Sequence, residues 1–267
     1  MGLDTGRDLR DKLLIAHGIL MTCGWTMFLA TGILSARYLR KHWPDNLLVG
    51  IRMWFNLHRA ANLIGLAYTI CGFVIIFVAN DWIWVGPKAT HTGKQNREWT
   101  SIHAMLGLLA CILAWAQPLN AVLRCQKGSK FRAIFNAVHR FFGIASFVLA
   151  MAAIMIACVH FEAMFSNRKA AMGLFILYIA VLGVSIILME IVKVLRWRSS
   201  ATPRSSSPAS ENEPLPFGPY GSSHSGHMSD KKENTKYNVA ILVIFFFYLI
   251  VAVGVAVSMS ILIGLGL

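Results

Sequence analysis

The phrase FNLHRAANLIG at residues 55–65 returns in altered form as FNAVHRFFGIA at residues 135–145. Each copy places a histidine, followed at once by an arginine, at the entrance to a long apolar run. Because an ionisable side chain is costly inside a membrane, a histidine in this position is a functional hypothesis by default. Its repetition in two distant parts of the chain predicts two related sites.

Apolar runs long enough to cross a bilayer follow from the composition. The chain of 267 residues is 56% hydrophobic and 14% charged, whereas ordinary soluble domains are about a quarter charged. A helix of about 20 residues crosses the hydrocarbon core. Six runs meet this length, at 13–36, 54–79, 102–123, 139–159, 171–195 and 238–265. The sequence therefore predicts an all-α membrane protein with six transmembrane helices.

The net charge of +13 is distributed unevenly over the loops. Of the 25 Lys and Arg residues, 17 fall in the alternate segments 37–59, 124–140 and 193–236. Short loops rich in Lys and Arg stay in the cytoplasm, so we expect the chain to begin and end on the other side. Topology thus accounts for the basic charge. We expect no nucleic-acid partner, because no basic stripe is interleaved with aromatic residues.

The chain divides into four predicted segments. Residues 1–12 form an extracytoplasmic stub, and residues 13–196 form a transmembrane domain of five helices. Residues 197–236 are rich in Ser, Pro and Gly without apolar periodicity, which predicts a disordered cytoplasmic linker. Residues 237–267 hold the sixth helix, which is apolar all round and is predicted to be peripheral and to face lipid.

Four of the nine histidines stand at the beginning of successive spans. They are His17, His58, His103 and His139. Because consecutive spans alternate in direction, His17 and His103 share the outer level of the membrane, and His58 and His139 share the inner level. Each level then presents two facing imidazoles.

Haem suits two facing imidazoles better than zinc does. Zinc takes four protein ligands at a structural site, and Cys23, Cys71 and Cys111 lie deeper than the histidine of their helix. Haem iron receives four nitrogens from its porphyrin and asks the protein only for axial ligands. The sequence therefore predicts a four-helix di-haem core. Arg59 and Arg140, next to the inner histidines, stand where haem propionates would emerge, and snorkelling of each arginine to the membrane surface is an equally good interpretation.

These residues resemble the cytochrome b561 family of transmembrane di-haem electron carriers. The resemblance covers residues 13 to about 195 and includes the four histidines and the phrases HGILMTCGW, QPLNAVLR and FNAVHRFFG. It is closest to the branch in which this domain follows an extracytoplasmic DOMON domain, the ferric-chelate reductase 1 type, also called stromal cell-derived receptor. Since only a short stub precedes the first span, we expect a truncated form or a fragment without those outer domains.

The resemblance implies two b-type haems, the outer one ligated by His17 and His103 and the inner one by His58 and His139. It also implies a transmembrane ferric-chelate reductase that moves single electrons from cytoplasmic ascorbate, or another reductant, to an outer acceptor such as ferric chelate. The expected location is the plasma membrane or an endomembrane vesicle, with a homodimer left open. An anionic donor would be attracted by basic residues beside the inner haem, namely Arg37, Lys41, Arg124 and Arg132.

Two other functions stay open at this point. If the chain were a metal-ion transporter, we would expect Gly or Pro to interrupt the spans in the two corresponding halves of the protein, and polar groups to lie at mid-depth in the membrane. The spans lack both features. A haem-free scaffold or receptor accessory protein would use the same six spans without a cofactor. The visible spectrum of the purified protein distinguishes this last function from a cytochrome.

Overall fold

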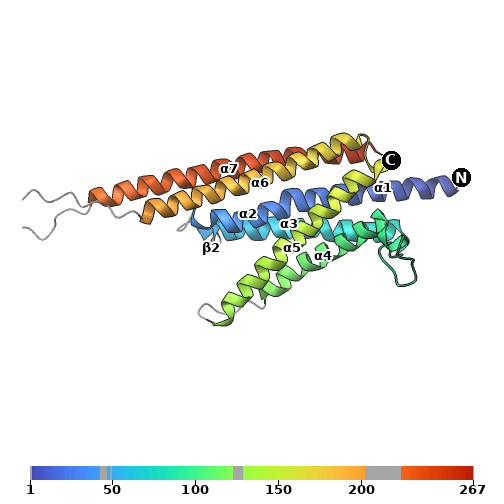
Figure 1. Cartoon of the computed structure of the whole chain (residues 1–267), viewed down its shortest axis with the longest axis horizontal. Coiled ribbons are helices and arrows are strands. Elements are labelled where there is room, and N and C mark those ends of the chain that lie inside the picture. The colour runs from blue at the N-terminus through green and yellow to red at the C-terminus, as the bar shows by residue number, and fades with distance from the viewer. Residues whose placement is uncertain (1, 43–46, 49, 123–128, 202–223, 267) are drawn as a thin grey trace, which may run out of the picture.

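The structure is a computed structural model that consists almost entirely of long helices (Figure 1). It describes residues 2–42, 47–48, 50–122, 129–201 and 224–266. The first span is built from α1 (Gly2–Thr22), the π-helix η1 (Cys23–Leu29) and α2 (Ala30–Tyr38), which follow one another without a break. The other spans are α3 (Met53–Ala79), α4 (Trp99–Val122), α5 (Phe131–His160), α6 (Arg168–Ala201) and α7 (His224–Gly264).

Short elements connect these helices. Single turns of 3-10 helix are η2 (Leu39–Lys41), η3 (Gln95–Arg97) and η4 (Glu162–Met164). The strands β1 (Leu47–Leu48) and β2 (Ile51–Arg52) pair in antiparallel fashion just before α3.

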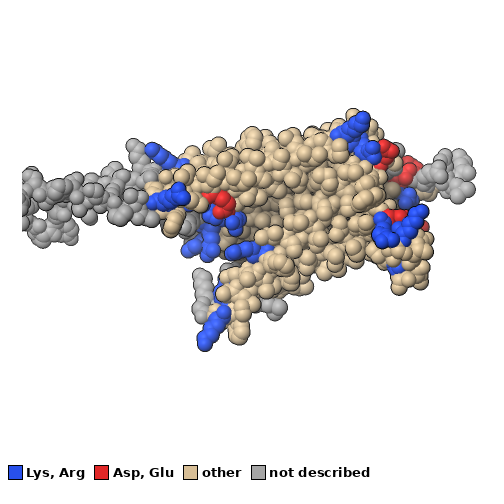
Figure 2. All heavy atoms as spheres, in the orientation of Figure 1, with Lys and Arg blue, Asp and Glu red and all other residues tan. Residues whose placement is uncertain are grey.

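The prediction of six membrane spans is confirmed. Among the residues that the structure describes, six stretches are long and apolar enough to cross a bilayer, at Asp8–Tyr38, Met53–Ala79, Trp99–Val122, Phe131–His160, Arg168–Ser199 and Thr235–Gly264. Figure 2 shows the charged side chains gathered toward the two ends of the bundle, with a wide band free of them between. Large apolar side chains are exposed in the spans, among them Val148 at 58% and Ile250 at 71%. Lipid would cover such a band.

Several helices extend beyond the apolar runs of the sequence. The predicted stub belongs to α1, where Lys12 and Asp8 form an ion pair one turn apart. In the predicted linker, α6 continues to Ala201 and α7 begins at His224, so helical structure enters the segment from both ends. Residues 202–223 of that segment lie outside the described residues. Backbone hydrogen bonds within a helix remain satisfied as it leaves the membrane, so the helix need not end where the apolar run ends.

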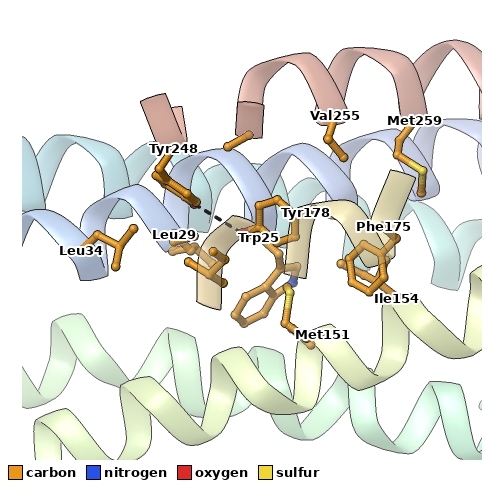
Figure 3. Close-up of a cluster of buried hydrophobic side chains, with 14 of the residues drawn as sticks. Trp25, Leu29, Leu34, Met151, Ile154, Phe175, Tyr178, Tyr248, Val255 and Met259 are labelled. Atoms are coloured by element: carbon orange, nitrogen blue, oxygen red, sulfur yellow. Dashed lines mark hydrogen bonds between the residues drawn. The ribbon is translucent and has the colours of Figure 1, made fainter. Parts of the chain in front are cut away.

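The bundle consists of three helix pairs that lie side by side. Figure 1 shows α6 beside α7, the first span beside α3, and α4 beside α5, with the last pair inclined to the others. The buried core lies where the first span meets α6 and α7 (Figure 3). Trp25, Leu29, Phe175, Tyr178 and Tyr248 are each at most 4% exposed there.

The expectation that the sixth span is a peripheral helix facing lipid is wrong in one respect. α7 does expose apolar side chains such as Ile250, but it also has a buried face. That face consists of Ile241, Phe245, Tyr248, Ala252, Val255, Met259 and Ile263, which recur every three or four residues. Lipid and a packed membrane-protein core select the same apolar side chains, so the composition of the helix does not reveal which face is buried.

Candidate metal centres

The four histidines form two pairs in the structure. The ring centroids of His17 on α1 and His103 on α4 are 6.4 Å apart, with an interplanar angle of 73°. Those of His58 on α3 and His139 on α5 are also 6.4 Å apart, with an angle of 72°. We call these pair A and pair B, respectively. The structure therefore brings together the same two pairs of histidines that the alternating direction of the spans predicts.

Both pairs have the spacing that one iron atom requires between two axial imidazoles. A metal–nitrogen bond is about 2 Å long and the ring centre lies roughly 1 Å beyond the nitrogen, which places the two centres about 6 Å apart. Within the described part of the chain, no group of three or more His, Cys, Asp or Glu side chains could hold a metal ion. Each pair therefore has two ring nitrogens at the separation that a haem iron would require from its protein ligands.

A backbone carbonyl holds the ring of three of the four histidines. In each case the ring Nδ1 lies 2.9 Å from a carbonyl oxygen on a neighbouring helix. The contacts are His17 with Gly72, His58 with Gly32 and His103 with Ala153. An Nδ1–H that donates to a carbonyl fixes the tautomer in which Nε2 carries the free lone pair, and such second contacts are typical of metal-binding histidines. The sequence could not identify these acceptors, because every residue has a carbonyl.

Pair A lines a cavity of about 550 Å³. Its walls are mostly apolar and come from α1, η1, α3, α4, α5, η4 and α7, and the polar residues Arg10, Asp11, His160 and Glu162 also line it. This volume lies within the usual range for small-molecule sites, about 300–1,000 Å³. One turn after His103, a Cβ added to Gly107 would meet no atom within 4 Å. The cavity therefore has space beside the ligand for a flat macrocycle.

Pair B is flanked by aromatic rings and arginines. Phe55 stacks on His58 at 6.3 Å and 23°, and Phe135 stacks on His139 at 5.9 Å and 9°. The guanidinium groups of Arg59 and Arg132 lie over these two phenyl rings, at 5.6 Å and 5.7 Å. The repeated phrase of the sequence thus places a phenylalanine one helical turn before each histidine of pair B. Sequence reasoning overlooked this role, although the repetition of FN before both histidines was its signal.

Asn62 is a further residue at pair B that sequence reasoning did not single out for this role. Its amide Nδ2 lies 3.1 Å from Nδ1 of His58 and donates to the carbonyl of His58 at 2.6 Å. The side chain fits only because Gly32 faces it, since a Cβ at that position would lie 2.7 Å from Cγ of Asn62. Since Nδ1–H of His58 donates to the carbonyl of Gly32, the Asn62 amide donates to the backbone of His58 and packs beside the ring.

The basic residues that the sequence predicts to attract an anionic donor differ from one another in their surroundings. Arg37 forms an ion pair with Glu190 on α6, with Nη2 and Oε1 2.7 Å apart, and the same carboxylate contacts Tyr38 and Lys193. A donor that binds Arg37 would therefore compete with Glu190.

The remaining basic residues lie nearer to pair B or are only partly described. Arg59 and Arg140 are both exposed one residue after the pair B histidines, and Arg132 reaches pair B through Phe135. Lys41 lies in η2, and Arg124 lies outside the described residues.

The part of the chain that carries the four histidines is similar to known proteins. The profile of the eukaryotic cytochrome b561 family matches residues 16–166, which include all four histidines. The chain is 32% identical over 144 residues to ferric-chelate reductase 1 of Homo sapiens, covering 54% of this chain and 22% of that protein. It is 28% identical over 153 residues to a putative ferric-chelate reductase 1 of Xenopus laevis, covering 57% and 24%. It is 29% identical over 163 residues to a cytochrome b561, DM13 and DOMON domain-containing protein of Arabidopsis thaliana, covering 59% and 16%.

The chain spans less than a quarter of the length of these relatives. No solved structure matches it. The family profile, however, covers more than half of the chain and includes both histidine pairs. This protein therefore belongs to the cytochrome b561 family of transmembrane b-type cytochromes, an oxidoreductase family whose members bind haem b.

Proposed function

We propose that the chain holds two b-type haems and carries single electrons across the membrane from a donor near pair B to an acceptor near pair A. The observation that carries this proposal is the equal separation of 6.4 Å in the two histidine pairs. When bound, haem b supplies a one-electron couple between ferric and ferrous iron. His17 and His103 would hold one haem, and His58 and His139 the other.

The imidazoles decide which chemistry the sites favour. A haem iron held by two of these histidines would have no position left for oxygen, which would favour electron transfer over oxygen activation. Along α3, His58 and Gly72, whose carbonyl holds His17, are separated by about 21 Å at 1.5 Å per residue. The two pairs therefore divide the hydrocarbon core, about 30 Å thick, into shorter steps.

Charge supports the orientation of the proposed electron path. The loops richest in Lys and Arg adjoin pair B, so we place pair B toward the cytoplasm and both chain termini on the opposite side. An anionic donor such as ascorbate would be attracted by Arg132 beside pair B, together with Arg37, Lys41 and Arg124. Arg59 and Arg140 are exposed next to the pair B histidines and could bind the haem propionates.

The acceptor is proposed from the relatives. Two of them are named ferric-chelate reductase 1 or putative ferric-chelate reductase 1. We therefore propose a ferric chelate as the substrate reduced at the pair A side. The donor would lose one electron and the ferric ion would gain it, so the overall step is balanced without another reactant.

The test uses the full chain in lipid nanodiscs and in sealed proteoliposomes. Conversion of bound haem to its pyridine complex should give two haem b per chain. Ascorbate enclosed in the vesicles should reduce both, and a ferric chelate outside should yield ferrous iron that a membrane-impermeant chromophore detects. A colourless protein would overturn the proposal in favour of a haem-free scaffold. Haem reduction without ferrous product outside would overturn the proposed acceptor.

A further inference from the structure

The π-helix η1 interrupts the first span between two groups that serve different histidine pairs. Upstream lies His17 of pair A, and downstream lies Gly32, whose carbonyl holds His58 of pair B. At its end, the N–H of Ala30 donates to the carbonyl of Trp25, five residues back. A π-helix accommodates an additional residue in an α-helix and is frequent at functional sites.

The additional residue is visible when the three helices with known acceptor carbonyls are compared. Each carries a pair histidine and, further along, the carbonyl that holds a histidine of the other pair. The spacing is 14 residues from His58 to Gly72, 14 from His139 to Ala153, and 15 from His17 to Gly32. The first span therefore has one residue more than α3 and α5 between equivalent groups, and the π-helix lies within that interval.

One additional residue would change the direction of everything that follows it in a regular α-helix. With 3.6 residues per turn, the rotation is about 100°. Gly32 would then turn away from His58, or His17 would turn away from His103. Because the π-helix absorbs the additional residue, His17 and the carbonyl of Gly32 can both face α3 and the pairs. Both candidate haem sites depend on this segment.

A buried pair of tyrosines contacts the π-helix from outside the four-helix core. In a regular α-helix the Ala30 N–H would donate to the carbonyl of Thr26, four residues back, but here it donates to that of Trp25. The carbonyl of Thr26 instead accepts hydrogen bonds from two tyrosine hydroxyls. The hydroxyl of Tyr178 on α6 donates at 3.0 Å, and that of Tyr248 on α7 donates at 3.2 Å. Both rings are buried beside Trp25 and Leu29, as Figure 3 shows. A carbonyl without a partner is strongly disfavoured at this depth, where no water can replace the tyrosines.

We propose that Tyr178 and Tyr248 are positioning residues for both haem sites, because they stabilise the π-helix by donating to the carbonyl of Thr26. This inference assigns a role to α6 and α7, which carry no pair histidine. It rests on the proposed function for the haem, whereas the stabilisation of the π-helix by the tyrosines needs no cofactor. The proposed function could therefore fail while this contact is still demonstrated, and the reverse also holds.

The test compares Tyr178→Phe, Tyr248→Phe and the double variant with the matched control Tyr237→Phe. Tyr237 is on α7, about three turns from Tyr248, so its replacement removes one hydroxyl from the same helix. Hydrogen exchange of residues 23–32 is measured in the haem-free and haem-loaded full chain. Each single variant keeps one donor and should remain near the wild type. The double variant should exchange about tenfold faster or more, because the carbonyl loses both partners.

The haem-loaded protein supplies the readout that a general loss of stability would not change. In the double variant, the electron paramagnetic resonance g values of both haems should shift together, because the π-helix sets His17 and Gly32 at once. The control should leave them unchanged. The inference would be overturned if exchange in 23–32 rises no more than in Tyr237→Phe, or if only one haem signal moves.

A deletion tests the spacing independently. Removal of Met27 from the π-helix restores 14 residues between His17 and Gly32. We expect both haems to be retained and the double tyrosine replacement to lose its effect on the spectra. Removal of Ala67 from α3, within the 14-residue interval from His58 to Gly72, should instead eliminate haem binding. An unfolded Met27 deletion, or one that loses both haems, counts against the spacing argument.

Discussion

Pair A and pair B share their ring geometry but differ in their surroundings. Both have centroids 6.4 Å apart and nearly perpendicular rings. Pair A lines a 550 Å³ cavity with mostly apolar walls, whereas pair B lies among stacked phenyl rings with guanidinium groups above them. Helix spacing therefore sets the separation of the ligands, and the residues beside the ligands set the polarity of each site.

This difference matches the tasks proposed for the two sites. A haem at pair B has positive side chains close by, which would attract an anionic donor from water. A haem at pair A would lie among mostly apolar side chains, with the polar residues Arg10, Asp11, His160 and Glu162 lining the same cavity. The comparison predicts that replacement of a ligand side chain at one pair leaves the other pair intact, whereas a change in the length of the first span, α3 or α5, each of which serves both pairs, affects both.

Replacement of single histidines by alanine should have the largest effect. Loss of one axial ligand removes the haem of that pair, so each variant should retain one haem per chain. His17→Ala and His103→Ala should have the same residual spectrum, and His58→Ala and His139→Ala should have the complementary one. His91→Ala is the control, because His91 lies in the loop between α3 and α4 and belongs to neither pair. Loss of the same spectral component in His17→Ala and His58→Ala would contradict the pairing.

The second-largest effect is expected at Gly32 and Gly72, the two glycines whose carbonyls hold pair histidines. A Cβ at Gly32 would lie 2.7 Å from Cγ of Asn62, which is hydrogen-bonded to His58. A Cβ at Gly72 would meet the flexible end of Met21 at 3.3 Å. Gly32→Ala should therefore destabilise the protein by about 1–3 kcal/mol and change the haem signal of pair B. Gly72→Ala should have a smaller effect, confined to pair A, in thermal unfolding and spectroscopy. Equal effects of the two variants would show that Asn62 moves aside freely.

The six spans and the two pairs could be predicted from the sequence because they depend on strong rules. A chain segment in lipid must satisfy its backbone internally, so a long apolar run is a helix. Consecutive spans alternate in direction, so the positions of His17, His58, His103 and His139 assign each histidine to a level. Both arguments need only residue type and chain order, and neither needs a tertiary contact.

Other features could not be predicted because they leave no mark in residue type. The π-helix changes the spacing by one residue within an apolar run that still resembles an ordinary helix. The acceptors at Gly72 and Ala153 are backbone groups. The buried face of α7 has the same composition as its lipid-facing side. Arg37 lies far along the chain from Glu190, so their ion pair becomes visible only in three dimensions.

A smaller effect concerns the reduction potential at pair B. Arg59 and Arg132 bring positive charge close to this pair, and nearby positive charge favours the reduced form of haem iron, which carries one positive charge fewer. Replacement of either by Gln should lower the potential of the pair B haem by tens of millivolts, about 1 kcal/mol or less. The pair A haem should be unaffected. Redox titration of the two haem signals measures both values, and Lys169→Gln, at the start of α6, is the control. Equal shifts at both haems would remove the distinction between the sites.

The smallest effect is a pH dependence at the η2 turn. His42 follows η2, and its Nε2 lies 2.8 Å from the carbonyl of Asn238 on α7. Burial lowers the pKa of His42 below its ordinary value, and the charge of Arg196 lowers it further, although the hydrogen bond to Asn238 opposes this shift. The folded protein thus favours the neutral ring. The resulting stability is present above about pH 6.5 and is lost as the pH falls through the lowered folded-state pKa.

Thermal unfolding of the full chain in nanodiscs at pH 7 and pH 5 measures this contribution. Because the ring is only partly buried, the Tm should fall by no more than about 2 °C through this group. His42→Gln keeps an N–H donor but cannot be protonated, so it should reduce the difference between the two pH values. His91→Gln, in the loop between α3 and α4, is the matched control and should leave the difference unchanged. An unchanged pH dependence in His42→Gln would show that the contact of His42 with α7 contributes nothing measurable. A smaller pH dependence in His42→Gln would assign part of the acid sensitivity to the contact between the end of the first span and α7.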